Sequence, residues 1–197
     1  MNPNECEWEV RYQTGDIPWE KGEGSPGLAD FLRDRSDLPR GSVLIPGCGT
    51  GHDTRIWARH GFIPTGLDIA PSAVRLATEK TVTEGLPGTY RKGDFLRDSA
   101  PMTYDWVFEH TLFCAIPPAD RNLYPDAVSR WLRPRGYLLA VHYMLRNATE
   151  GPPFGTTQEE LIERFMPQFE LISGWIPRSY ANRTGLELML WWRRRPV

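Results

Sequence analysis

Short apolar segments alternate with segments of helical periodicity along most of the chain. This pattern predicts strands at 42–45, 62–69, 88–95, 104–110, 137–145, 169–180 and 186–193. It predicts helices at 28–35, 52–60, 71–84, 119–131 and 158–165. Strands that alternate with helices are typical of a mainly parallel sheet with helices on both faces. The last two strands have no helix between them and predict an antiparallel hairpin at one edge, so the expected fold class is α/β.

Residues 1–40 do not follow the regular pattern. Their aromatic residues Trp8, Tyr12 and Trp19 are separated by polar residues and by a turn at 15–18. Aromatic side chains usually pack against other apolar groups, and packing is the simplest interpretation of these three. Only the segment at 28–35 has the pattern of a short amphipathic helix.

The size and charge of the chain narrow the class of protein. The 197 residues predict one domain, 1–197, and the net charge of -2 favours neither nucleic acid nor an anionic membrane as a partner. Three cysteines far apart predict neither a disulfide framework nor a zinc site, and the four histidines form no metal-ligand motif. No signal peptide or membrane-spanning run is expected, so we predict a cytoplasmic monomer without a bound metal.

A glycine-rich turn follows the first predicted strand. Gly47, Gly49 and Gly51 stand at alternate positions between that strand and a helix, where parallel sheets bind ligands. Asp68 and Ile69 end the second strand, where a carboxylate can accept hydrogen bonds from ribose hydroxyls. His52 occupies the place of the third glycine in a dinucleotide motif, so the tighter spacing suits S-adenosylmethionine, which has no pyrophosphate. A nicotinamide-dependent oxidoreductase remains the alternative for this turn.

A second acidic residue follows the third predicted strand. Gly93, Asp94 and Phe95 are interpreted as an adenine contact, in which the carboxylate accepts the amino group and the phenyl ring covers the base. A plain turn is the competing interpretation.

Four motifs together resemble the thiopurine S-methyltransferase family and its thiol- and halide-methylating relatives. They are the Trp-rich stretch 8–15 with 18–20, the loop 43–49, the segment 108–116 with Pro117, Pro118 and Arg121, and the segment 151–154. The resemblance implies a Rossmann-like sheet of seven strands. It also implies that residues 1–40 form an N-terminal cap over the active site.

The resemblance also assigns roles to residues. Those expected to bind the cofactor are Trp8, Tyr12, Trp19, Gly47, Gly49, Gly51, Asp68, Ile69, Gly93, Asp94, Phe95 and Glu109. Those expected to bind the acceptor are Tyr12, Trp19, His110, Pro153, Phe154 and Arg183. His110 stands where the mammalian thiopurine enzymes have an arginine, and it is the candidate catalytic residue. Tyr12 and Trp19 are expected to attract the sulfonium through their aromatic faces.

The expected activity is methyl transfer from S-adenosylmethionine to a small soft nucleophile, with S-adenosylhomocysteine as the second product. A thiol is favoured as acceptor because it is already partly ionised near neutral pH and needs no strong base. O- or N-methylation with His110 as base is one alternative. A protein that binds the cofactor or its product without catalysis is another.

Overall fold

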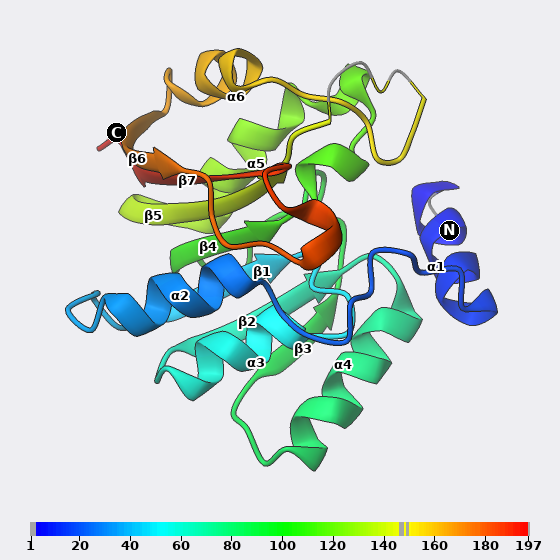
Figure 1. Ribbon diagram of the computed structural model, residues 1–197. Coiled ribbons are helices and arrows are strands. Elements are labelled where there is room, and N and C mark those ends of the chain that lie inside the picture. Colours follow the sequence, from blue (N-terminus) through cyan, green and yellow to red (C-terminus); the bar gives the residue numbers. More distant parts are fainter. Residues whose placement is uncertain (1–2, 146–147, 149, 197) are drawn as a thin grey trace. The chain divides into compact units, whose positions relative to one another are not determined.

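The computed structural model describes residues 3–145, 148 and 150–196, so residues 1 and 2 of the predicted cap lie outside the described part (Figure 1). The chain divides into two compact units, Met1–Asp98 and Ser99–Val197. No helix among the described residues is long and apolar enough to cross a membrane.

The first unit contains three parallel strands in the order β3-β2-β1. Their bounds are β1 Ser42–Pro46, β2 Ile63–Asp68 and β3 Thr89–Lys92. Helix α3 (His52–Arg59) packs on β1 and β2, and helix α4 (Pro71–Thr83) packs on β2 and β3. Since all three strands run in the same direction, the glycine turn after β1 and the acidic residue after β2 reach the same edge of the sheet.

Two further helices precede this sheet. Helix α2 (Pro26–Asp34) packs on α3 and begins with a capping bond, in which the backbone N–H of Leu28 donates to the Ser25 hydroxyl at 3.3 Å. Helix α1 (Pro3–Thr14) packs on α4 and was not predicted. Its sequence has no clear apolar stripe that would predict a helix. Val10 is 52% exposed, and the aromatic face consists only of Trp8 and Tyr12, which are one helical turn apart.

The second unit contains four strands in the order β4-β5-β7-β6. They are β4 Tyr104–His110, β5 Leu132–Tyr143, β6 Phe169–Trp175 and β7 Glu187–Arg194. β4 and β5 are parallel, whereas β7 runs antiparallel to both β5 and β6. The predicted fold class, with seven strands in a mainly parallel sheet and an antiparallel edge, is confirmed.

Helices and short turns connect these strands. Helix α5 (Leu123–Trp131) packs on β4 and β5, and helix α6 (Gln158–Phe165) precedes β6. Three 3-10 turns, η1 Phe113–Ala115, η2 Pro118–Asp120 and η3 Ala181–Arg183, lie between the larger elements.

Three predicted boundaries in this unit were wrong by four or five residues, and the end of β5 and both ends of β7 differ by one or two. β5 begins at Leu132 rather than at 137, because a register shift opposite β4 accommodates residues 133–136, where Arg135 has a positive φ of 63°. α5 begins at Leu123 because the residues before it form η2. β6 ends at Trp175 rather than at 180, close to Pro177, which cannot donate a ladder hydrogen bond.

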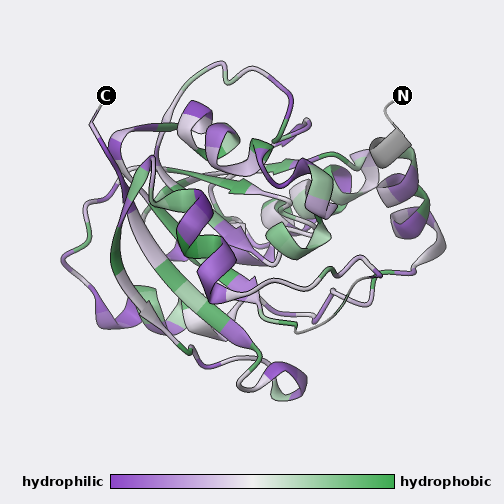
Figure 2. Ribbon diagram, turned by 90° about the horizontal axis from the view of Figure 1, so that it is seen from above, coloured by the Kyte–Doolittle hydropathy of each residue, from purple (hydrophilic) through white to green (hydrophobic). Residues whose placement is uncertain are grey.

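Each unit has buried aromatic residues. Trp57 lies in the first unit, and Trp106 and Trp192 lie in the second, all three completely buried. In Figure 2 the helices change between hydrophobic and hydrophilic colours along their length, as expected of elements that bury one face.

Tyr90 on β3 packs behind the glycine turn. A Cβ atom on Gly66 of β2 would lie 2.5 Å from Tyr90 Cδ1 and 2.8 Å from Cys48 Sγ. The Tyr90 hydroxyl in turn forms a hydrogen bond with the hydroxyl of Thr81 at 2.7 Å. Tyr90 therefore packs against both β2 and the glycine turn.

We expect Gly66→Ala to destabilise the protein by about 1–3 kcal/mol, because the added methyl would overlap the packed ring of Tyr90. Urea unfolding monitored by fluorescence measures this change. Gly88→Ala is the matched control, since its Cβ would meet only ordinary contacts of 3.5 Å or more. Equal effects of the two substitutions would contradict this account of Tyr90.

Candidate active site

The three glycines of the turn all have left-handed backbone angles. Gly47, Gly49 and Gly51 have φ values of 62°, 53° and 80°, which favour glycine at each position. A Cβ on Gly49 would lie 3.1 Å from the Tyr12 hydroxyl, whereas one on Gly51 would lie 2.5 Å from the Tyr90 hydroxyl. A side chain at position 51 would therefore collide with Tyr90 of β3. The absence of a side chain at position 49 leaves room for Tyr12 of α1.

Asp68 connects the two loops that follow β1 and β2. Its Oδ2 accepts the backbone N–H of Gly49 at 2.9 Å, and its Oδ1 accepts that of Ala70 at 3.0 Å. Burial raises the pKa of the carboxyl, although hydrogen bonds from the backbone, including that of Ile69, act in the opposite direction. A carboxylate oxygen can accept two hydrogen bonds, so Asp68 shapes the loop and keeps acceptor capacity for ribose hydroxyls.

An aromatic cluster from residues 8–19 lies beside this carboxylate. Trp19 Nε1 donates to the Tyr12 hydroxyl at 3.2 Å, and the rings of Trp8 and Trp19 meet edge to face with centroids 5.2 Å apart. Burial, and then the negative charge of Asp68, raise the pKa of Tyr12, so the phenol stays protonated. The guanidinium of Arg11 lies 4.5 Å from the Trp19 ring centroid, so a cation from the chain itself already occupies one face of that ring.

A polar strap, defined here as Glu20, Thr50, His52 and Arg55, fastens the N-terminal segment to the glycine turn. The Glu20 carboxylate accepts the Thr50 hydroxyl and lies 2.9 Å from His52 Nε2. Although burial acts against it, hydrogen bonds from His52 and Thr50 hold the pKa of Glu20 at about 2. Sequence reasoning missed this strap, because Glu20 and Thr50 lie 30 positions apart.

Arg55 determines which tautomer His52 adopts. A guanidinium can only donate, and Arg55 Nη2 lies 2.9 Å from His52 Nδ1, so Nδ1 is the acceptor. Nε2 is then the protonated nitrogen, and it lies 2.9 Å from the Glu20 carboxylate. His52 is therefore a positioning group of the turn.

Residues 93–98 form a tight turn after β3. Asp94 Oδ1 accepts the backbone N–H of Leu96 at 2.9 Å, and Asp98 Oδ2 accepts that of Asp94 at 2.8 Å. Gly93 is partly exposed, and Phe95 is 6% exposed. The turn, which was one of the two interpretations of residues 93–95, is therefore present. The other interpretation, contact with adenine, stays a prediction.

In the second unit, β4 ends in the buried carboxylate of Glu109. Its Oε2 accepts the backbone N–H groups of Leu112 and Phe113 at 2.7 and 3.3 Å. Its Oε1 lies 3.0 Å from Nδ1 of His142 on β5, and both side chains are at most 1% exposed. Glu109 thus organises the segment that follows β4.

His110, the next residue, faces a second carboxylate. His110 Nε2 lies 3.8 Å from Oε1 of Glu187 on β7, and the same oxygen accepts Nη1 of Arg183 at 3.2 Å. Although burial acts in the opposite direction, His110, Ser179 and Arg183 hold the pKa of Glu187 below its ordinary value. The structure brings together the predicted His110 and Arg183 through a carboxylate that sequence reasoning did not find.

Two tyrosine rings enclose the Arg183 guanidinium. Its Cζ lies 4.6 Å from the ring centroid of Tyr143 and 5.8 Å from that of Tyr180, and Tyr180 also stacks against His110. Cation–π contacts of this kind hold a guanidinium in place while leaving its edge available for hydrogen bonds.

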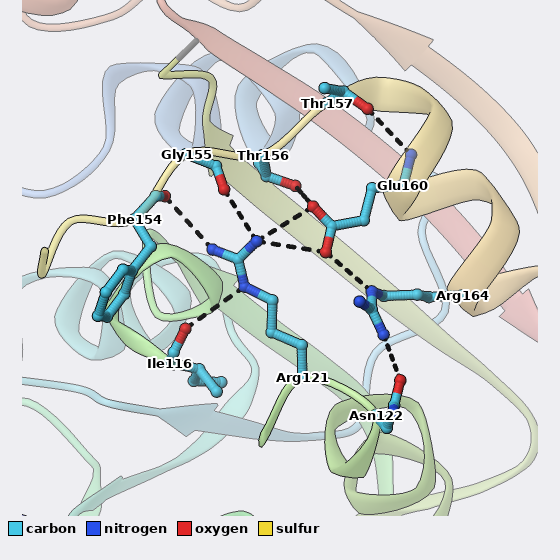
Figure 3. A network of polar contacts seen from close by, with 9 residues as sticks. All are labelled: Ile116, Arg121, Asn122, Phe154, Gly155, Thr156, Thr157, Glu160 and Arg164. Atoms are coloured by element: carbon cyan, nitrogen blue, oxygen red, sulfur yellow. Dashed lines mark hydrogen bonds and ion pairs between the residues drawn. The ribbon is translucent and has the colours of Figure 1, made fainter. Parts of the chain in front are cut away.

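The predicted acceptor loop, residues 151–154, is fixed together with Gly155 by Arg121 (Figure 3). The buried guanidinium donates to the main-chain oxygens of Ile116, Phe154 and Gly155 at 3.3, 3.4 and 2.8 Å. It also pairs with Glu160 of α6 at 3.1 Å. Arg121 therefore joins the segment after β4 to the acceptor loop and to α6.

The acceptor loop makes one more contact with the segment after β4. The Phe154 N–H donates to the Cys114 carbonyl at 2.7 Å, and Phe154 is half-buried whereas Pro153 is exposed. Burial raises the pKa of the Cys114 thiol to about 12, so this thiol is a protonated core group. Among the residues that the structure describes, no group of three or more histidine, cysteine or acidic side chains could hold a metal ion.

Solved structures share the fold of this chain. The N-methyltransferase NodS of Bradyrhizobium japonicum, in complex with S-adenosyl-L-homocysteine, has a TM-score of 0.75 and 17% identity, covering 97% of this chain and 98% of that one. A methyltransferase of Clostridium acetobutylicum that depends on S-adenosylmethionine has a TM-score of 0.73 and 11% identity, covering 95% and 99%. The fold is that of the Rossmann-like methyltransferases.

Sequence comparison gives the family. Residues 3–174 match the family described as thiopurine S-methyltransferase (TPMT). The chain is 33% identical over 194 residues to a probable thiol methyltransferase 2 of Arabidopsis thaliana, and 32% identical over 191 residues to thiocyanate methyltransferase 1 of Brassica oleracea. Each comparison covers 95% of this chain and 84% of the relative. The chain belongs to the thiopurine S-methyltransferase family, and it is a methyltransferase that uses S-adenosylmethionine.

We expect Asp68→Asn to weaken S-adenosylmethionine binding about 10- to 100-fold, because an amide loses the charge and the acceptor that shape the loop. Isothermal calorimetry measures the affinity. Asp34→Asn removes a carboxylate from an exposed ion pair with Arg33 on α2 and should leave the affinity unchanged. Equal affinities of wild type and Asp68→Asn would refute the role of Asp68.

We expect Arg121→Met to destabilise the protein by about 3–5 kcal/mol, because it takes the buried donor from three main-chain oxygens and removes one of the donors to Glu160. Methionine keeps an apolar stem but loses the guanidinium, whose Cζ lies 4.7 Å from the Phe113 ring centroid. Chemical unfolding measures the loss. Arg164→Met, which removes the partly exposed partner of the same carboxylate, should cost less than about 1 kcal/mol. A similar loss in both variants would show that Arg121 has no special role.

Proposed function

We propose that this methyltransferase acts on the sulfur of a small anionic acceptor, such as a thiolate, hydrosulfide or thiocyanate. The observation that supports this most directly is the group of Arg183, His110 and Glu187, in which two basic side chains share one buried carboxylate. Such a group favours a ligand with a negative charge. The relatives named for thiol and thiocyanate methylation favour the same class of acceptor.

The residues of the first unit suit the cofactor. The three glycines of the turn are all left-handed, and α3 begins directly after Gly51 without a side-chain cap. Asp68 and Ile69 would hold the ribose, and Tyr12 and Trp19 would cover the ligand. We propose on the same basis that residues 1–40 act as a cap over the glycine turn, fastened by the polar strap. When bound, S-adenosylmethionine supplies a methyl group on a positively charged sulfur.

The reaction does not require the protein to supply a general acid or base. The acceptor sulfur donates an electron pair to the methyl carbon as the bond from that carbon to the sulfonium breaks, and an anionic acceptor has no proton to lose. The remaining tasks are to orient the acceptor and to exclude water. Arg183 and His110 would orient the anion, and Phe154 on the loop fixed by Arg121 would limit access.

The partner proposed is therefore a small molecule, not nucleic acid or a membrane. The three cysteines are free thiols, which suits the reducing cytoplasm that we propose as the location.

A panel of acceptors with radiolabelled S-adenosylmethionine tests the proposal. We expect transfer to thiocyanate, hydrosulfide and small thiols, with kcat/KM well above that for phenols and amines. Arg183→Met should raise the KM for thiocyanate by about tenfold or more, because a charge-assisted hydrogen bond is lost.

Calorimetry with S-adenosylmethionine is the control for folding of each variant. Preference for phenols or amines, abolished by His110→Ala, would favour the O- or N-methylation alternative. Tight cofactor binding without transfer to any acceptor would favour a non-catalytic binding protein.

A further inference from the structure

Arg11 of α1 is held on the faces of two indole rings. Its Cζ lies 4.5 Å from the ring centroid of Trp19 and 5.5 Å from that of Trp8. Its Nε donates to the Asp16 carboxylate at 3.1 Å, and the side chains of the two residues are 22% and 66% exposed. Because solvent screens so exposed a carboxylate, this ion pair is weak and leaves room for a second, better enclosed anion.

The two terminal nitrogens of Arg11 are available to such an anion. Both hydrogen bonds of the guanidinium, to the carboxylate and to the main-chain oxygen of Asp16, come from Nε. Nη1 and Nη2 form no hydrogen bond or ion pair with any residue that the structure describes. A guanidinium stacked on an aromatic face keeps its edge for hydrogen bonds, and that edge matches a carboxylate with two parallel bonds.

Aromatic side chains connect Arg11 to the glycine turn. Trp19, on which the guanidinium rests, donates from Nε1 to the Tyr12 hydroxyl at 3.2 Å. That hydroxyl in turn lies 3.1 Å from the place of a Cβ on Gly49. This series of direct contacts brings the guanidinium close to the proposed cofactor site.

The turn itself is unfavourable for a carboxylate. Burial is the main cause of the raised pKa of Tyr12, and the negative charges of Asp68 and Glu20 add to it, so both carboxylates lie near this hydroxyl. Three backbone N–H groups of the turn already donate within the protein, namely those of Cys48, Gly49 and Gly51. These surroundings suit the ammonium and the sulfonium of S-adenosylmethionine, and they repel its carboxylate.

Other cations in the described part of the first unit are less suitable. Arg55 is engaged by the polar strap and by an ion pair with Glu84 at 3.0 Å. The Lys21 ammonium donates to the carbonyl of Pro18 at 2.7 Å, and it lacks the fork that a carboxylate matches. Arg11 combines enclosure, a fixed position and two available donors.

We propose that Arg11 binds the carboxylate at the methionine end of S-adenosylmethionine, and that Trp8 and Trp19 hold its guanidinium in place for this purpose. The ribose then belongs to Asp68, and the two positive groups of the cofactor belong to the acidic surroundings of the turn. The N-terminal segment thus recognises the cofactor by charge as well as by apolar contact. This inference rests on the cap proposed above and does not depend on the identity of the acceptor.

Isothermal calorimetry with two ligands tests this proposal without turnover. S-Adenosylhomocysteine has the carboxylate, whereas S-adenosyl-3-thiopropylamine is the same molecule without it. In wild type we expect S-adenosylhomocysteine to bind about 10- to 100-fold more tightly, as one charge-assisted pair provides. In Arg11→Met its affinity should fall by about the same factor, while that of the decarboxylated ligand stays unchanged.

Two further variants are compared with these. Arg11→Lys should keep part of the preference for the carboxylate, because the charge remains but the fork is lost. Arg33→Met removes an exposed arginine that pairs with Asp30 and Asp34 on α2, and it should leave both affinities at their wild-type values.

The ratio of the two affinities separates recognition from packing. A cap that is merely loosened binds both ligands more weakly by the same factor, so a wild-type ratio in Arg11→Met would overturn the proposal. A wild-type protein that does not distinguish the two ligands would overturn it as well. Absence of methyl transfer to every sulfur acceptor, with the ratio lost in Arg11→Met, would instead refute the proposed function and leave the role of Arg11 intact.

Discussion

The carboxylate of Asp68 is the interaction on which the cofactor side of this protein depends. It accepts N–H groups from Gly49 and Ala70, and thereby fixes the turn after β1 against the start of α4. The cost of burying this charge is visible in its raised pKa, and backbone donors offset part of that cost. Gly49 is bonded to this carboxylate, and its negative charge also acts on the Tyr12 phenol.

The N-terminal segment is held by charges rather than by a large apolar face. Glu9 of α1 accepts the backbone N–H and the hydroxyl of Ser72 at 2.9 and 2.7 Å, in the first turn of α4. Glu20 fastens the following segment to Thr50 and His52. Helix α4 has no capping side chain of its own, so α1 supplies the cap that the helix lacks.

The sequence was sufficient for the elements with strong periodicity, and β4 and α6 were predicted at their observed bounds. The ligand-binding roles of Asp68, His110 and Arg183 stay predictions, and the structure places each of them in a polar group. The partners of these residues were not predictable, because Glu187 and Glu20 become neighbours of His110 and His52 only through the fold. Helix α1 was missed for a related reason, since its stability comes from contacts with α4 and not from its own pattern.

Tyr90 places a constraint on residues in three different elements. Its ring occupies the space that a side chain at position 66 would need, and its hydroxyl occupies the corresponding space at position 51. A smaller residue at position 90 would remove the ring from both positions, but Gly51 would still need its φ of 80°, and a Cβ at position 66 would still lie 2.8 Å from Cys48 Sγ. A larger residue at position 66 is therefore expected only in relatives that replace both the ring at position 90 and the thiol at position 48, whereas glycine at position 51 should persist without them.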